Sequence, residues 1–149
     1  MMKAKILILL VLAVIINSCN KDKYGSKPQL TFKSVSTTFL QPQEIITFDM
    51  ELTEGTNVSQ DTIWIQQVTK NCAASNFTQG YPVPSFPTTK NLKATYEITY
   101  AYGIGLGYPS IQTPSCGNHN DTCVYKFWTK DVKNNYSDTI VSPIIVISQ

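Results

Sequence analysis

Few residues of this 149-residue chain have catalytic potential. The single histidine, His119, lies in the segment Cys116–Asp121, which reads as a loop. Nucleophilic catalysis needs a base within reach of the nucleophile, and the chain has no G-x-S-x-G serine. The glycine-rich stretch Tyr102–Tyr108 lacks the lysine of a phosphate-binding loop. We therefore expect no catalytic residues and no cofactor, and interpret the chain as non-enzymatic.

Oxygen-bearing side chains gather between residues 131 and 138: Asp131, Asn134, Asn135 and Asp138. Calcium takes several oxygen ligands, which this cluster offers. Asp and Asn also favour turns, because their side chains hydrogen-bond to nearby backbone. We interpret the segment as a turn and keep Asp131 and Asp138 as calcium candidates. The chain has no zinc-ligand spacing.

Aromatic residues concentrate in two long segments that we expect to be loops, Lys70–Asn91 and Tyr102–Thr122. Flat rings near the end of a β-sandwich can stack on sugars or anchor a protein partner. The alternative is that they cover the core beneath the loops. The ligand-binding candidates are Tyr81, Phe86, Tyr102 and Tyr108, with Phe77 nearby.

One of the four cysteines is assigned to lipidation below, which leaves Cys72, Cys116 and Cys123. An oxidising compartment favours one disulfide among them. Cys116 and Cys123 are close in sequence. However, Cys123 has the parity of Tyr125 and Phe127 in an expected strand and should point into the core. We predict a Cys72–Cys116 disulfide, with Cys123 as a buried thiol.

The first nineteen residues read as an export signal. Lys3 and Lys5 precede the apolar run Ile6–Ile16, and Asn17-Ser18 lead to Cys19 instead of an A-x-A site. A transmembrane helix is the first alternative, but eleven residues span only about 16 Å of a ~30 Å hydrocarbon core. An ordinary secretory signal with an incidental cysteine is the second.

The segment resembles the bacterial lipoprotein signal, whose lipobox ends in a small residue and the acylated cysteine. The resemblance implies cleavage before Cys19, lipidation of Cys19 and anchoring in the outer membrane, facing the periplasm or the cell surface. Two or three acyl chains hold a protein durably on a membrane. Without residues 1–18 the chain has ten lysines, no arginine and ten acidic residues. It therefore lacks the clustered positive charge of a nucleic-acid binder.

From residue 29 onward the chain alternates apolar and polar residues with the period of β-strands. In Glu44–Leu52, for example, Ile46 and Phe48 share one face while Thr47 and Asp49 share the other. We expect strands at Gln29–Thr37, Glu44–Leu52, Thr62–Val68, Leu92–Tyr100, Cys123–Lys130 and Thr139–Ile147. Short strands separated by turns predict an antiparallel β-sandwich over residues 29–149, behind a flexible tether at 19–28.

The segment Asp121–Phe127 has the spacing D-x-C-x-Y-x-F and resembles the start of strand F in immunoglobulin-like (Ig-like) domains. That resemblance implies a corner hydrogen bond from Tyr125. The next segment is similar to the F–G hairpin of fibronectin type III domains, with Asn134 or Asn135 where glycine is usual. It implies an Ig-like sandwich of about seven strands.

Three further positions fit this resemblance. Trp64 matches the core tryptophan of strand C, while Phe48 and Phe127 stand where the inter-sheet disulfide is usual. The whole layout also resembles small lipoproteins of the Bacteroidota, which place an Ig-like domain behind the lipid cysteine. This implies a non-catalytic envelope module that binds a protein or glycan or serves a structural role. The alternative is an accessory glycan-binding lipoprotein of a polysaccharide uptake system.

Overall fold

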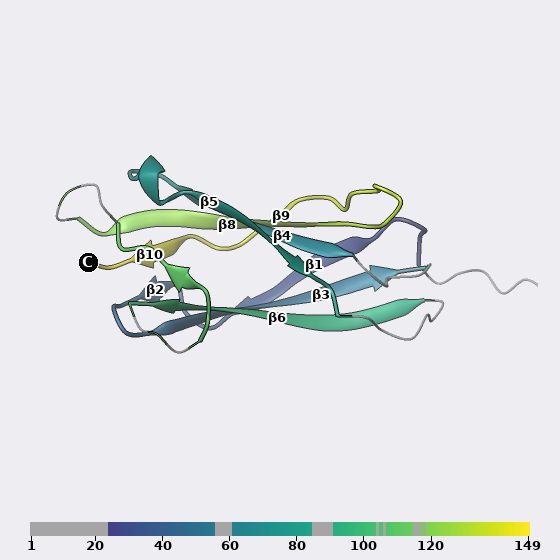
Figure 1. Cartoon of the computed structure of the whole chain (residues 1–149), viewed down its shortest axis with the longest axis horizontal. Helices are drawn as coiled ribbons and strands as arrows, with labels where there is room; N and C mark the ends of the chain where they lie inside the picture. The colour runs from purple at the N-terminus through teal and green to yellow at the C-terminus, as the bar shows by residue number, and fades with distance from the viewer. Residues whose placement is uncertain are drawn as a thin grey trace, which may run out of the picture.

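A computed structural model describes residues 24–55, 61–84, 91–103, 105, 107–114, 117 and 119–149. It is an all-β, Ig-like sandwich (Figure 1). The strands are β1 (Gln29–Val35), β2 (Phe39–Leu40), β3 (Ile45–Glu54), β4 (Thr62–Thr69), β5 (Phe77–Pro82), β6 (Leu92–Tyr102), β7 (Ser110–Ile111), β8 (Asp121–Lys130), β9 (Ile140–Val141) and β10 (Ile145–Ile147), with a 3₁₀ turn at Ala73–Ser75.

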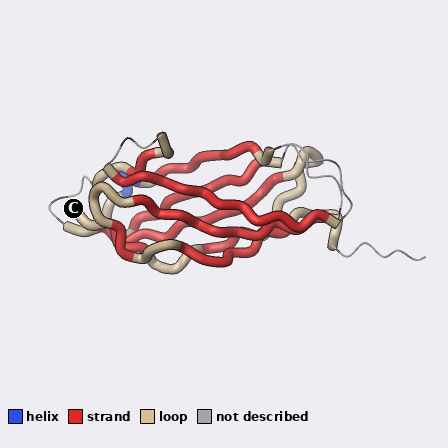
Figure 2. The backbone as a smooth tube through the Cα atoms, turned by 90° about the horizontal axis from the view of Figure 1, so that it is seen from below, coloured by secondary structure: helices blue, strands red, loops and turns tan. Residues whose placement is uncertain are grey.

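The strands form two sheets. The four-stranded sheet has the order β1-β3-β6-β7, and the six-stranded sheet has the order β2-β10-β8-β4-β5, with β9 paired to β8. The long pairs are antiparallel, while the short pairs β2–β10 and β6–β7 are parallel. Figure 2 shows the strands running along the long axis of the molecule. The described chain starts at the end opposite the C-terminus (Figure 1).

The predicted fold class is confirmed, and the alternation that predicted it builds the core. Every second residue of β3 and of β8 is buried between the sheets. The ring of Phe48 lies 4.7 Å from that of Tyr125 and 5.3 Å from that of Phe127, centroid to centroid. Phe48 and Phe127 therefore face each other across the core, where other Ig-like domains have their disulfide.

Two expectations taken from the Ig resemblance are wrong. Trp64 does not lie in the core, since Ile63 and Ile65 point inward and strand alternation turns Trp64 to the outer face. The Tyr125 hydroxyl donates to the side-chain oxygen of Gln67, 2.9 Å away, instead of making a backbone corner bond. Of the two asparagines expected where glycine is usual, Asn134 has the positive φ, 65°, that glycine readily adopts.

Strand β5 occupies part of the segment expected to be a loop. It pairs with β4 over Phe77–Pro82 and extends the six-stranded sheet. The ring of Phe77 packs against Tyr100 and Tyr125, so this aromatic covers the core. Within the described ranges, no helix is long and apolar enough to cross a membrane.

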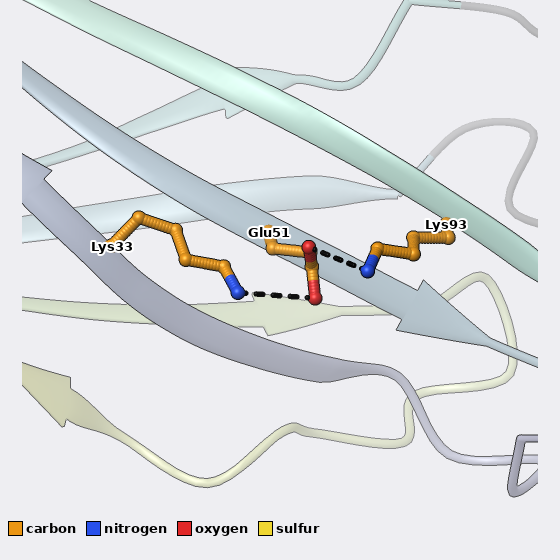
Figure 3. A network of polar contacts seen from close by, with 3 residues as sticks. All are labelled: Lys33, Glu51 and Lys93. Carbon is orange, nitrogen blue, oxygen red and sulfur yellow. Dashed lines mark ion pairs between the residues drawn. The ribbon is translucent and has the colours of Figure 1, made fainter.

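The outer face of the four-stranded sheet carries two lysines and three acidic residues. Glu51 of β3 accepts ion pairs from Lys33 of β1 at 3.3 Å and from Lys93 of β6 at 3.0 Å (Figure 3). These two lysines lower the pKa of Glu51. Beside them, Ser34 donates a hydrogen bond to the carboxylate of Asp49. Positive charge on this face is thus already paired.

Candidate functional site

The only two tryptophans of the chain, Trp64 and Trp128, lie directly opposite each other in the β4–β8 ladder. Both point away from the core, because the alternate residues Ile65 and Phe127 are completely buried. Their ring centroids are 6.3 Å apart and their planes differ by 7°. The outer face of the six-stranded sheet therefore presents two parallel, half-buried indoles.

Gly80 of β5 makes room for this arrangement. It pairs with Trp64 on the side of β4 away from Trp128. A Cβ atom at Gly80 would lie 3.2 Å from Cζ3 of Trp64 and 3.0 Å from Cγ2 of Thr62. The indole of Trp64 thus lies against bare backbone of the neighbouring strand, a contact that a glycine in a sheet permits.

Polar side chains flank the indoles on both sides along the strands. Gln66 and Lys126 oppose each other one outward position from the tryptophans, and Lys130 lies one outward position from Trp128 in the other direction. Successive outward residues of a strand are about 7 Å apart. The Nζ atom of Lys130 lies 5.5 Å from the ring centroid of Tyr136.

An open hollow of about 610 Å³ lies beside Trp128. Gln66, Lys126 and Tyr136 are among the residues that line it. We call the surface made by Trp64, Trp128, Gln66, Lys126, Lys130 and Tyr136 the tryptophan face. It joins flat apolar rings to hydrogen-bond donors and a cation, a combination that suits a ligand with both apolar and polar surfaces.

Sequence reasoning missed the tryptophan face although a signal for it was present. The alternation in Thr62–Val68 places Ile63 and Ile65 on one side and therefore Trp64 on the other. The same parity pairs Trp128 with Lys126 on the outer side of β8. The Ig resemblance assigned Trp64 to the core, against its own strand's pattern.

The structure brings together two of the four predicted ligand residues. Tyr81 and Tyr108 line a cleft of about 390 Å³, together with Tyr96. Its lining includes residues of β5, at the edge of the six-stranded sheet, and of β6 in the four-stranded sheet. The Tyr81 hydroxyl donates to that of Tyr100 at 2.9 Å, and burial raises the pKa of Tyr81. We call this the tyrosine cleft.

Tyr102 does not join them, and the expectation that it presents a ring at the surface is wrong. Its side chain is 1% exposed, and its hydroxyl donates to the carbonyl of Ser148 at 2.6 Å. Tyr102 closes the core at the last residue of β6, where the glycine-rich segment begins. Phe86 lies outside the described residues.

Two buried carboxyl groups meet at the end of the sandwich where the described chain begins. Glu54 ends β3 and is 2% exposed, while Asp61 precedes β4 and is completely buried. Burial and then the charge of Asp61 raise the pKa of Glu54 to about 8. Burial also raises the pKa of Asp61, although the hydrogen bond from Glu54 opposes this shift. The protonated Glu54 therefore donates to the Asp61 carboxylate at neutral pH.

The carboxylate of Asp131, one of the two calcium candidates, accepts hydrogen bonds from its own turn. Oδ1 of Asp131 accepts the backbone N–H groups of Lys133 and Asn135 at 2.8 and 2.7 Å, and Oδ2 accepts the Asn135 side-chain amide at 2.7 Å. Asp138 is exposed. In the part of the chain that the structure describes, no group of three or more His, Cys, Asp or Glu residues is arranged to hold a metal ion.

The cysteines divide as the parity of β8 predicted. Cys123 is a free thiol, 2% exposed, and burial raises its pKa to about 12. Cys72 is disulfide-bonded. Cys116 lies outside the described residues, so the Cys72–Cys116 pairing stays a prediction, as does lipidation of Cys19 for the same reason. His119 is exposed to solvent.

No protein-family model and no curated protein matches the chain. Among solved structures, it is similar to the sporulation control protein Spo0M of Bacillus subtilis, with 11% identity and a TM-score of 0.40 over 83% of this chain and 50% of that chain. It is also similar to a Niemann-Pick type C2 protein of the Japanese carpenter ant, with 12% identity and a TM-score of 0.42 over 86% of this chain and 98% of that chain. Neither likeness identifies a function for this chain.

Proposed function

We propose that this protein is a lipid-anchored module of the bacterial cell envelope that binds a ligand without converting it chemically. The charged start, the apolar run and the position of Cys19 support export and anchoring in the outer membrane. The absence of a serine-histidine or phosphate-loop motif from the sequence supports a non-catalytic role. Residues 29–149 then form the part that carries the binding surface.

The tryptophan face is the observation that carries the binding role. The core is filled by other side chains, so Trp64 and Trp128 are not needed to fill it. Large aromatic rings beside hydrogen-bonding groups are typical of sites where a few residues supply most of the binding energy. A cross-strand pair alone adds about 0.2–1 kcal/mol to the stability of a sheet, but it needs no hollow lined by polar groups beside it.

A second candidate is an accessory glycan-binding role in a polysaccharide uptake system. The parallel indoles favour it, since the apolar faces of sugar rings stack on flat aromatic surfaces while their hydroxyls hydrogen-bond to neighbours. Gln66 supplies an amide donor and acceptor at the edge of the indoles. The partner is then a polysaccharide instead of a protein.

The two tryptophans make the test direct, because all tryptophan emission of the chain arises from this face. The full chain, purified in detergent, is titrated with envelope polysaccharides and purified envelope proteins. A saturable change in emission, lost in Trp64→Ala, supports the proposal. Tyr108→Ala in the tyrosine cleft is the control and keeps the response. Saturable binding that leaves the emission unchanged and persists in Trp64→Ala contradicts the assignment to this face.

A further inference from the structure

The outer face of the six-stranded sheet is positively charged, unlike that of the four-stranded sheet. Across the strands of the six-stranded sheet, all of which the structure describes, the one acidic residue is Asp121, which is 2% exposed. Lys126 and Lys130 both lie on the outward side, one on either side of Trp128. The opposite face instead pairs its lysines with Glu51.

The neighbouring turn does not cancel this charge within the hollow. Asp131 is buried, and three hydrogen bonds from its own turn occupy its carboxylate. Asp138 is exposed but does not line the hollow beside Trp128. Lys126 does line the hollow, at the edge of the indole. A ligand seated there meets a cation, and none of the described residues that line the hollow carries a carboxylate.

We infer that the tryptophan face binds an acidic polysaccharide, with a carboxylate-bearing sugar ring against the indole of Trp128 and its carboxylate on Lys126. The inference rests on the proposed function and adds the chemical class of the ligand.

The spacing of the face matches this ligand. Successive outward residues of a strand are roughly 7 Å apart, so a substituent of a sugar ring over Trp128 comes within reach of the long side chain of Lys126. Hydrogen bonds between an ammonium and a carboxylate are roughly twice as strong as those between neutral groups. Gln66, opposite Lys126, then accepts or donates to a ring hydroxyl. The charge of Lys126 favours the carboxylate-bearing sugar, while the indole of Trp128 supplies the contact area.

The test compares each acidic polymer with its own neutral form. Fragments of polygalacturonate, alginate and hyaluronate, each also with its carboxyl groups methyl-esterified, are titrated into the full chain in detergent while tryptophan emission is followed. We expect at least one acid form to bind about tenfold more tightly than its ester, with the difference shrinking at high salt. Trp128→Ala lowers the affinity for both forms roughly tenfold or more.

The lysine variants separate charge from stacking. Lys126→Gln lowers the affinity for the acid form about threefold to tenfold and leaves the ester form unchanged. Lys93→Gln, on the opposite sheet, is the matched control and changes neither affinity. Equal affinity for acid and ester in every pair overturns the inference but leaves the binding role standing. Failure of all three acid forms to bind overturns the inference, and the broader titration then decides the binding role alone.

Discussion

Glu54 and Asp61 place two ionisable groups in a buried position with one proton between them. Apart from each other, Oε2 of Glu54 and both Oδ atoms of Asp61 have no hydrogen-bond partner among the described residues. The proton on Glu54 is therefore what satisfies the pair, and like charges this close cannot both ionise without cost. Loss of that proton leaves two buried negative charges near Asp131.

This pair predicts that stability falls as the pH rises. The unfolded chain releases the Glu54 proton near 4.5, whereas the folded chain holds it to about 8. The folded state thus binds more protons between these values, and the free energy of unfolding decreases across that window. Glu54→Gln keeps a neutral donor to Asp61 at every pH. We expect it to raise the free energy of unfolding above about pH 8 by on the order of 1–3 kcal/mol, and to change little below about pH 5.

Urea unfolding of both proteins over this pH range measures the effect. Glu97→Gln is the matched control, since Glu97 is exposed on β6. Parallel pH profiles for the wild type and Glu54→Gln contradict a shared buried proton.

Cys123 predicts a specific pattern of thiol labelling. A pKa of about 12 leaves almost no thiolate at neutral pH, and the side chain is 2% exposed. We expect no reaction with a maleimide in the folded protein and one labelled thiol after denaturation without a reductant. Cys72 and its partner label only after reduction, and peptide mapping then tests whether that partner is Cys116. Rapid labelling of the native protein contradicts the buried thiol.

Single residues were predictable where alternation alone decided their side of the sheet. Alternation correctly placed Cys123 inward, whereas the facing core positions of Phe48 and Phe127 came from the Ig resemblance. Alternation also predicts that Trp64 points outward, but the family resemblance placed it in the core. Glu54 is the last residue of β3, and Asp61 is the residue before β4. The periodicity of the strands does not predict that these two side chains lie close together.

At the scale of elements, β5 holds the tryptophan face in place. Gly80→Ala puts a methyl carbon 3.0 Å from Cγ2 of Thr62 and 3.2 Å from Cζ3 of Trp64, so these two side chains must move by a few tenths of an ångström. We expect weaker exciton coupling between the two indoles in circular dichroism and a ligand affinity lowered severalfold, while the sheet persists. Gly105→Ala, where a Cβ meets no atom within 4 Å, is the matched control. An unchanged dichroism spectrum means that the glycine does not position Trp64.

The long strands could be predicted, and the short ones could not. Alternation over Glu44–Leu52 and Cys123–Lys130 anticipated β3 and β8, because one buried face imposes a period of two. Strands β2 and β7 have two residues each, too few to show any period. The expected strand Thr139–Ile147 is divided into β9 and β10, and Pro143, which has no N–H to donate to a ladder, lies between them.

The whole molecule is asymmetric in two directions. Across its thickness, one outer face carries paired charges, and the other carries indoles and two lysines that form no ion pair with a described residue. Along its length, the described chain begins at one end and the C-terminus lies at the other (Figure 1). The first described residues, Tyr24 and Gly25, contact Asn91 and Gly55 at the Glu54 end. Under the proposed lipidation of Cys19, the domain is attached to the membrane at that end, and the tryptophan face lies on the side of the sandwich.

Lipid anchoring is the prediction on which this orientation depends. In a bacterial host fed an alkyne-bearing fatty acid, we expect the protein to carry the label and to fractionate with the outer membrane, because two or three acyl chains bind durably where one is marginal. Cys19→Ala abolishes the label. Cys123→Ala is the matched control: the Cys123 thiol is buried, and we expect this variant to keep the label on Cys19. Protease added to intact cells then separates the two orientations: rapid digestion places the tryptophan face outside the cell, whereas protection until the membrane is broken places it in the periplasm. A label that survives in Cys19→Ala contradicts the anchor and, with it, the attachment to the membrane at the Glu54 end.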